Sequence, residues 1–345
     1  MAPAPAASSA GAGPADVSIL IVTFDHADEI GACLDGALAQ AAAGVAVEVV
    51  VVDNASQDAT AARVAERVGD GVALIETGSN RGFASAVNAA FAATSGRHVL
   101  ILNPDCVMDR GCARALRDHL AARPQVALAA ALLHDPDGTP QLHARRDAGL
   151  RDALWTFTTV GRRIDATLRG GRALAKRRYE DLWAGGAPAE PVAVFCPAAA
   201  CVMASRSDLE PAPFDERFPL FFNDGDLCAR LRRAGRSVEI VPAATAAHGY
   251  GTSVGRAQRA DPARMRAEWV ASLRRYAARW WRRPQRAALT ALLLADAAAA
   301  AALCLAKRED PREVRGTLGG LGLPGGPPPL LTPVRRIGLP RRRRP

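Results

Sequence analysis

The sequence predicts an α/β protein with a mostly parallel sheet flanked by helices and a C-terminal helical extension. Apolar runs rich in β-branched residues recur as far as Leu102, and a segment with helical spacing separates each run from the next. Such continuous apolar runs are typical of strands that are covered on both faces in a parallel sheet. The extension is predicted from Ala287–Ala306, an alanine-rich run with a single charged residue, Asp296.

The predicted strands and helices alternate along the chain. Strands are expected at Val17–Phe24, Glu48–Val52, Ala73–Glu76 and His98–Leu102. Helices are expected between them, at residues 28–40, 59–68 and 84–94. Strand, helix and strand make a βαβ unit, so we expect the four strands to place their carboxyl ends along one edge of the sheet.

Polar residues follow the predicted strands at this edge, where open α/β sheets bind ligands. No Gly-x-Gly-x-x-Gly motif follows the first strand and no P-loop motif occurs, so a pyrophosphate must be held by other groups. Asp53 suits hydrogen bonds to a base and ribose, and Asp105 suits a divalent metal shared with phosphate oxygens. Each aspartate also fits ordinary turn chemistry, an Asx turn at Asp53 and an Asn-Pro-Asp turn at Asp105.

A second set of acids lies in Phe214–Cys228, where an aromatic run is followed at once by a predicted helix. Asp224 and Asp226 are expected at the N-terminus of that helix, where aspartate is favoured, so capping is the alternative for both. One cap needs one acid, however, and Asp224 follows Phe221–Phe222, whose rings can partly desolvate it. Asp224 is therefore the better candidate for a general base.

Composition and charge bound the setting of the protein. The 345 residues, 49% of them hydrophobic, suffice for one catalytic domain of roughly 250 residues with appendages. Seven cysteines occur without a Cys-x-x-Cys pair, which indicates neither a zinc site nor a disulfide framework and favours a reducing cytoplasm. Residues 1–16 lack the basic and apolar regions of a signal peptide, so we expect a disordered leader.

The net charge of +9 is concentrated late in the chain, which ends in Arg341–Arg344. A basic end attracts the phosphates of nucleic acids, anionic lipids or diphosphate-linked substrates, and charge alone does not choose among them. Trp280–Trp281, among arginines, precede Ala287–Ala306, which is long enough for a bilayer core, but its alanines and Asp296 oppose spanning. We expect peripheral attachment to an anionic membrane surface, with a soluble helix packed on the domain as the alternative.

Five ordered stretches resemble the family 2 glycosyltransferases, close to their rhamnosyltransferase-like branch. They are Ser18–Phe24, Val52–Asp58, Asn80–Asn88, Leu102–Asp105 and Phe214–Leu231. Each stretch alone is weak, but the five in order make the resemblance specific. It implies a GT-A fold, which is a Rossmann-like sheet for nucleotide-diphospho-sugar transfer, together with a nucleotide-sugar donor, Mg²⁺ or Mn²⁺, and inversion at the anomeric carbon.

The resemblance also implies roles for individual residues. Asp224 corresponds to the general base and Asp226 to the second acid of the same motif. Asp105 corresponds to the metal-binding end of an Asp-x-Asp motif, and His248 lies where the family often has a histidine near the diphosphate, with a satisfied surface histidine as the alternative. The implied donor-binding residues are Thr23, Asp53, Asn54, Asn80, Arg81, Gly82, Asn88 and Asn103.

Three positions depart from the family pattern. Asn103 replaces the first acid of Asp-x-Asp, which leaves fewer charged ligands for a metal. Asn223 stands where a glutamate usually precedes the base, and Ala199–Ala200 replace a Gly-Ala pair, which narrows the expected floor of the acceptor pocket. The proposed base and the metal carboxylate are both kept.

The expected organisation is a leader (1–16), a GT-A domain (17–255), C-terminal helices at a membrane (256–310) and a disordered Gly/Pro/Arg-rich tail (311–345). The basic segment 134–190 is expected to be a solvated helix face, with a lid over a phosphorylated acceptor as the alternative.

The expected function is transfer of a sugar, with rhamnose as one candidate, from a nucleotide sugar to a glycan or lipid-linked acceptor in cell-surface polysaccharide synthesis. The expected location is the cytoplasm, peripheral on the inner face of the cell membrane. A nucleotidyltransferase is one alternative, but that class generally needs a Gly-rich, Arg-containing loop where this chain has Thr23–His26. A nucleic-acid-binding protein is another, but no recognisable module accompanies the basic end, so we expect no nucleic-acid partner.

Overall fold

The computed structural model describes most of the chain between residues 15 and 329. The described residues are 15–141, 143–145, 149–150, 153–154, 158, 161, 163–164, 187–249, 261–308 and 310–329. Most of the expected leader, most of the basic segment 146–186, the stretch 250–260 and Arg341–Arg344 lie outside them.

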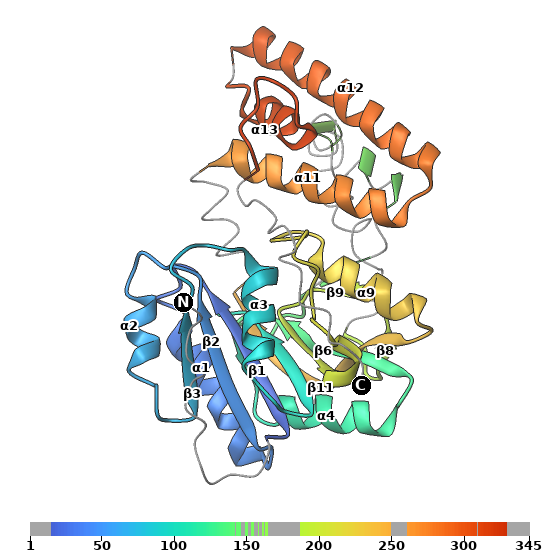
Figure 1. Ribbon diagram of the computed structural model, residues 1–345. Helices are drawn as coiled ribbons and strands as arrows, with labels where there is room; N and C mark the ends of the chain where they lie inside the picture. The colour runs from blue at the N-terminus through green and yellow to red at the C-terminus, as the bar shows by residue number, and fades with distance from the viewer. Residues whose placement is uncertain are drawn as a thin grey trace, which may run out of the picture.

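A mixed β-sheet forms the core of one part of the molecule, with helices packed against it (Figure 1). In the described part of the chain its order is β3-β2-β1-β4-β10-β6-β11-β5, and β8 pairs with β11. A separate two-stranded sheet joins β7 to β9. The strands are β1 (Val17–Thr23), β2 (Val47–Asp53), β3 (Val72–Glu76), β4 (His98–Leu102), β5 (Cys106–Met108), β6 (Val126–His134), β7 (Ala144–Arg145), β8 (Val192–Ala193), β9 (Cys196–Pro197), β10 (Cys201–Ser205) and β11 (Ser237–His248).

The four strands predicted from apolar runs are β1 to β4, and their parallel pairing is confirmed. β1 runs parallel to β2 and to β4, and β2 runs parallel to β3. The second half of the sheet departs from this pattern, because β10 runs antiparallel to both β4 and β6. The carboxyl ends of β1, β2 and β4 therefore lie at one edge, as expected.

Helices cover both faces of the sheet. The apolar side chains of α1 and α4 pack on one face, and those of α3 and α9 pack on the other. The helices of this domain are α1 (Ile30–Leu38), the 3₁₀ helix η1 (Ala39–Ala43), α2 (Thr60–Ala65), α3 (Phe83–Ala92), α4 (Cys112–Ala122), α8 (Arg206–Leu209) and α9 (Asn223–Arg233).

Three further helices form a unit beside the sheet domain, drawn in orange and red in Figure 1. They are α11 (Pro262–Trp280), α12 (Arg283–Lys307) and α13 (Arg312–Leu321). Helix α13 corrects the expectation that residues 311–345 are a disordered tail. Its glycines let it approach α11 closely, since a Cβ at Gly320 would lie 2.5 Å from the Cβ of Val270. A Gly-rich composition here serves tight helix packing and not disorder.

Helix α12 contains the predicted helical run, and it packs on this unit by one face. Leu289, Leu293 and Ala300 are buried on that face. Asp296 lies among them and forms an ion pair with Arg266 of α11, with Nη2 3.7 Å from Oδ2. Among the described residues α12 is the one helix long and apolar enough to cross a membrane.

Candidate active site

A cavity of about 320 Å³ opens at the carboxyl ends of the parallel strands. It brings together side chains that lie far apart in the sequence, since β1, β2 and β4 end beside the start of α9 and the end of β11. Seven of the expected site residues line it, namely Thr23, Asn54, Asn80, Gly82, Asn103, Asp224 and His248. Ala199 and Ala200 line it as well, so the Ala-Ala pair contributes to its wall.

Hydrogen bonds between asparagines fix one wall of this cavity. Asn54 Nδ2 donates to Asn80 Oδ1 over 3.0 Å, and the backbone N–H of Arg81 donates to Asn54 Oδ1 over 2.9 Å. Gly82 closes the loop with a positive φ of 85°, a conformation that favours glycine. The end of β2 and the loop before α3 are thereby held together at the cavity.

Asp224 occupies the second position of α9, and its side chain is 15% exposed. The expected helix N-terminus is confirmed, and Asp224 Oδ1 accepts a hydrogen bond from the backbone N–H of Gly225 over 2.7 Å. Its other oxygen forms an ion pair with Arg145, which the two-stranded sheet β7–β9 holds opposite Cys196. The guanidinium thereby fixes the position of the carboxylate at the cavity.

His248 and Asp105 face each other at the end of β11, where His248 Nε2 lies 3.5 Å from Asp105 Oδ1. The amide nitrogen of Gln141 donates to Asp135 and to the carbonyl of His248, so its oxygen faces His248 Nδ1 at 3.0 Å. A neutral imidazole then donates from Nδ1 and presents a lone pair at Nε2 toward the carboxylate. An acceptor nitrogen opposite a carboxylate oxygen suits a cation between them.

A bound divalent metal is what the resemblance implies at this place, and the donor set fits one. Carboxylate oxygen and imidazole nitrogen are both ligands for first-row divalent ions, and Mg²⁺ often takes only one or two carboxylates with phosphate oxygens and water. The described residues hold no group of three or more His, Cys, Asp or Glu side chains able to bind a metal by themselves.

Asp226 lies away from the cavity, although it follows Asp224 by two residues. Its side chain is fully buried and receives hydrogen bonds from Trp280 Nε1 at 3.0 Å and from Arg230 Nε at 3.2 Å. Arg279 of α11 also approaches Asp226 Oδ1, at 3.2 Å. Burial raises the pKa of the Asp226 carboxyl, against the opposing charges of Arg279 and Arg230. This contact network joins α9 to α11, which is a structural task, and the expected catalytic role of Asp226 stays a prediction.

Four other expected site residues also lie outside the cavity lining. Asp53 accepts from Ser56 N at 3.0 Å and from its hydroxyl at 2.5 Å, which is the turn alternative. Its lone pairs exceed these two bonds, so contact with a base stays a prediction. Asn88 exchanges hydrogen bonds with the backbone of Phe214, while Arg81 is exposed at the surface. Asp105, as described above, faces His248.

Sequence reasoning missed several residues that the fold brings to the site. Arg145 and Gln141 lie in the segment expected to be a solvated helix face, yet they contact Asp224 and His248. Met265 of α11 lines the cavity, so the C-terminal helices complete a site expected within 17–255 alone. His26 lines it too, and it is buried. No local motif marks these positions, because each depends on a contact distant in sequence.

Comparisons with known proteins assign part of this chain to an enzyme family. Residues 18–176 match the sequence model of glycosyl transferase family 2. This stretch is a family 2 glycosyltransferase domain. It holds the strand ends and the asparagine wall, so the protein is a glycosyltransferase, and the nucleotidyltransferase and nucleic-acid-binding alternatives are not favoured.

Relatives and a solved structure agree with that assignment. The chain is 28% identical over 265 residues to N-acetylglucosaminyl-diphospho-decaprenol L-rhamnosyltransferase of Mycobacterium tuberculosis, covering 70% of this chain and 80% of the relative. It is 43% identical over 90 residues to succinoglycan biosynthesis protein ExoO of Rhizobium meliloti, covering 26% and 25%. GalNAc-T7, solved with UDP, GalNAc and Mn²⁺, shares the fold with a TM-score of 0.50 at 14% identity, covering 68% of this chain and 44% of that one. The expected GT-A architecture is thereby confirmed.

Proposed function

We propose that this family 2 glycosyltransferase moves a sugar from a nucleotide-sugar donor to a hydroxyl of a glycan or lipid-linked acceptor, with inversion at the anomeric carbon. The observation that carries the proposal is the position of Asp224, a carboxylate in the wall of a cavity that strand-end asparagines also line. The rhamnosyltransferase relative, whose name includes a diphospho-decaprenol acceptor, supports a rhamnose donor and a lipid-linked acceptor in cell-surface polysaccharide synthesis.

Asp224 acts as the general base in this proposal. It takes the proton of the acceptor hydroxyl as that oxygen bonds to the anomeric carbon, and the bond from that carbon to the diphosphate breaks with its electron pair leaving on the phosphate oxygen. Base catalysis of this kind contributes about 10²–10⁴-fold. Arg145, as its ion-pair partner, holds the carboxylate in place.

Asp105 and His248 are the proposed protein ligands of the divalent ion, Mg²⁺ or Mn²⁺. When bound, the ion supplies Lewis-acid stabilisation of the departing diphosphate. Asn54, Asn80, Gly82 and Asn103, as cavity-lining residues, form the donor side of the site in this proposal.

We also propose that the protein works on the cytoplasmic face of a membrane as a peripheral protein. Helix α12 supports attachment, because it is apolar over a length that would span a bilayer. Asp296 inside its packed face argues against spanning, because its pairing with Arg266 would be lost in lipid.

The test is a panel of nucleoside diphosphate sugars, rhamnose among them, given to the purified full chain with Mn²⁺. We expect release of nucleoside diphosphate from one donor class, and a rise in that rate when a polyprenyl-diphosphate sugar acceptor is added. A chain that turns over no donor in the panel, with or without acceptor, would contradict the proposed reaction.

A further inference from the structure

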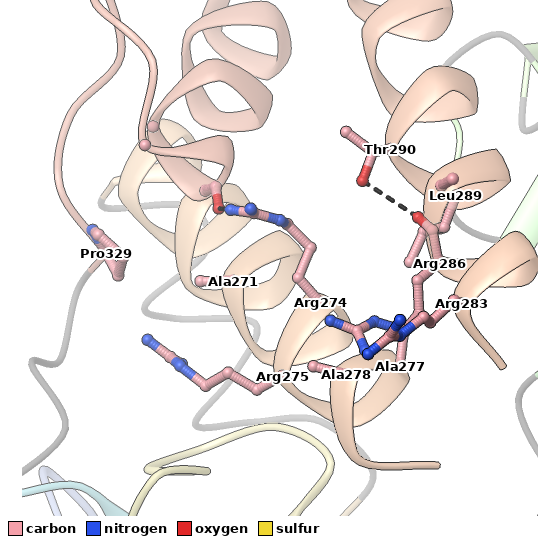
Figure 2. A pocket seen from close by; sticks show the side chains of 14 residues that line it. Ala271, Arg274, Arg275, Ala277, Ala278, Arg283, Arg286, Leu289, Thr290 and Pro329 are labelled. Carbon is pink, nitrogen blue, oxygen red and sulfur yellow. Dashed lines mark hydrogen bonds between the residues drawn. The ribbon is translucent and has the colours of Figure 1, made fainter. Parts of the chain in front are cut away.

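A second cavity, of about 730 Å³, lies among the three C-terminal helices (Figure 2). Helix α11 contributes Arg274 and Arg275 to its lining, and helix α12 contributes Arg283 and Arg286. The residues that line it include no aspartate or glutamate. We call it the arginine cavity. Four cations gathered around one hollow without an acid are expected to concentrate anions there.

The four arginines are not equally engaged. Arg275 forms an ion pair with the buried Glu268 at 3.5 Å, and Arg274 donates to the carbonyl of Gly320 at 3.1 Å. Within the described residues, by contrast, no hydrogen bond or ion pair holds the guanidinium groups of Arg283 and Arg286. In Figure 2 these two side chains extend from the first turns of α12 toward α11. Two positive charges are therefore left for a ligand to neutralise.

The N-terminus of α12 adds to this attraction. Helix α12 is 25 residues long and begins at Arg283, so the positive end of its dipole lies where the two unpaired arginines lie. Helix N-termini attract phosphates through this dipole. Arginine is moreover the side chain best shaped for phosphate oxygens, since its planar group donates two parallel hydrogen bonds.

The arginine cavity is separate from the active-site cavity. Both touch α11, but at a helical period of about 3.6 residues Arg274 projects from the side opposite Met265. Met265 lines the active-site cavity, and Tyr276, near the same side, packs its ring 5.4 Å from that of Phe222. A ligand bound at Arg274 would therefore lie across the helix from the reacting sugar.

The exposed face of α12 indicates which kind of anion reaches this cavity. Between the arginines at its start and Lys307 and Arg308 at its end, the exposed positions of α12 from 287 to 306 are alanine or leucine. Leu294 is 42% exposed and Leu305 is 81% exposed. An apolar helix face with cations at both ends is typical of helices that lie in the headgroup boundary of an anionic bilayer.

We propose that the arginine cavity binds the phosphate group of an anionic lipid headgroup and so seats α12 flat on the membrane. This inference rests on the proposed peripheral attachment and names its site. The same chemistry would accept a free phosphate, so the experiment separates these two sources. Each cation near an anionic surface strengthens binding about fivefold, so neutralising two should weaken it roughly 30-fold.

The experiment measures flotation of the purified full chain with liposomes of phosphatidylcholine alone or mixed with phosphatidylglycerol. The test variant is Arg283→Gln with Arg286→Gln, and the matched control is Arg110→Gln with Arg114→Gln, two exposed arginines of the sheet domain. We expect the parent chain to float with the mixed liposomes alone, the test variant to partition roughly 30-fold less, and the control to stay within about twofold.

Three outcomes would overturn the inference. Equal losses in test and control variants would mean that only total charge matters. A second outcome is that the test variant still floats, whereas a Leu294→Gln with Leu305→Gln variant does not. The chain would then bind membranes through the apolar face of α12 and not through the arginine cavity. Equilibrium dialysis that shows inorganic phosphate bound to a chain that never floats would replace the lipid with a soluble phosphate.

Donor turnover measured on the same preparations separates this inference from the proposed reaction. A chain that floats as expected but turns over no donor counts against the reaction alone. Circular dichroism of each variant confirms that the helices are intact.

Discussion

The active-site cavity and the arginine cavity hold charge in opposite ways. In the first, the one acid of the lining, Asp224, forms an ion pair with Arg145, and amides and apolar groups line most of the rest. In the second, cations gather without an acid in the lining. A balanced site selects its ligand by hydrogen-bond geometry, whereas an unbalanced one responds to any anion and weakens with salt.

Helix α11 lies between the two cavities and contributes residues to the lining of each. Its side facing α9 carries Tyr276 and Trp280, which contact Phe222 and Asp226, and its other side carries Arg274. Asp224 and Asp226, two residues apart in α9, therefore lie in different regions of the molecule. Asp224 lines the active-site cavity, while Asp226 lies in the joint between the sheet domain and the helical unit.

The largest expected effect is on the chemistry. Asp224→Asn keeps the size of the side chain but removes the proton acceptor, so we expect transfer to fall by at least about 100-fold. Donor affinity, measured by calorimetry, should change less than threefold. Asp118→Asn, an exposed acid on α4, serves as the control. Transfer at a tenth of the parent rate or more would remove Asp224 from the role of base.

The next effect concerns Asp105, which faces the cavity-lining His248. Asp105→Ala removes the carboxylate that faces His248, so we expect binding of the nucleoside diphosphate with Mn²⁺ to weaken by about 10–100-fold. Acceptor binding should change little, as calorimetry of each ligand would show. If the parent chain keeps full activity in excess chelator, arginines and not a metal neutralise the phosphates.

A third effect is expected at the joint between the sheet domain and the helical unit, where Asp226 contacts α11. Asp226→Ala leaves the N–H of Trp280 and two guanidinium groups without their buried acceptor, so we expect the free energy of unfolding to fall by about 2–3 kcal/mol in urea titrations. The transfer rate per folded molecule should stay within tenfold. A loss as large as that of Asp224→Asn, in a chain that remains folded, would return Asp226 to the chemistry.

A smaller effect is expected from the partner of the base. Arg145→Ala removes the group that positions Asp224, so we expect about a tenfold fall in kcat with KM for the donor nearly constant. Arg145→Lys should recover part of the loss, since it restores the charge but not the planar fork. A rise in donor KM with unchanged kcat would instead make Arg145 a binding residue.

The sequence predicts the first half of the fold well and the rest poorly, for physical reasons. β1 to β4 follow apolar β-branched runs, which local pattern detects because the strands are buried on both faces. β10 inserts antiparallel between β4 and β6, a pairing that no local pattern encodes. The sequence does not predict α13, because glycine disfavours helices. Its glycines are explained by the close packing of α13 against α11, which the sequence alone does not show.

The site shows the same division. Asp224 and the strand-end asparagines could be predicted, because motif and topology both place polar groups at that edge. Arg145 and Gln141 could not, since a basic residue or an amide in an irregular segment has many ordinary explanations. Asp226 satisfies the same motif as Asp224, but two residues are about half a helical turn, which points the two side chains into different regions.

The smallest predicted effect is a pH dependence of the joint. Burial opposes ionisation of Asp215, but hydrogen bonds and charge from Arg217, with Arg279 of α11, lower its pKa to about 2. A lowered carboxyl pKa adds stability above the unfolded-state value near 3.9, and this stability is lost as pH falls toward 2. Because solvent screens the ion pair at its exposed Arg217 side, we expect about 1 kcal/mol. Urea titrations at pH 6 and pH 3 should therefore show a smaller difference in Asp215→Asn than in the parent chain. Asp118→Asn should behave like the parent, and an Asp215→Asn chain with the full parental pH dependence would show that other carboxylates hold α11 in place.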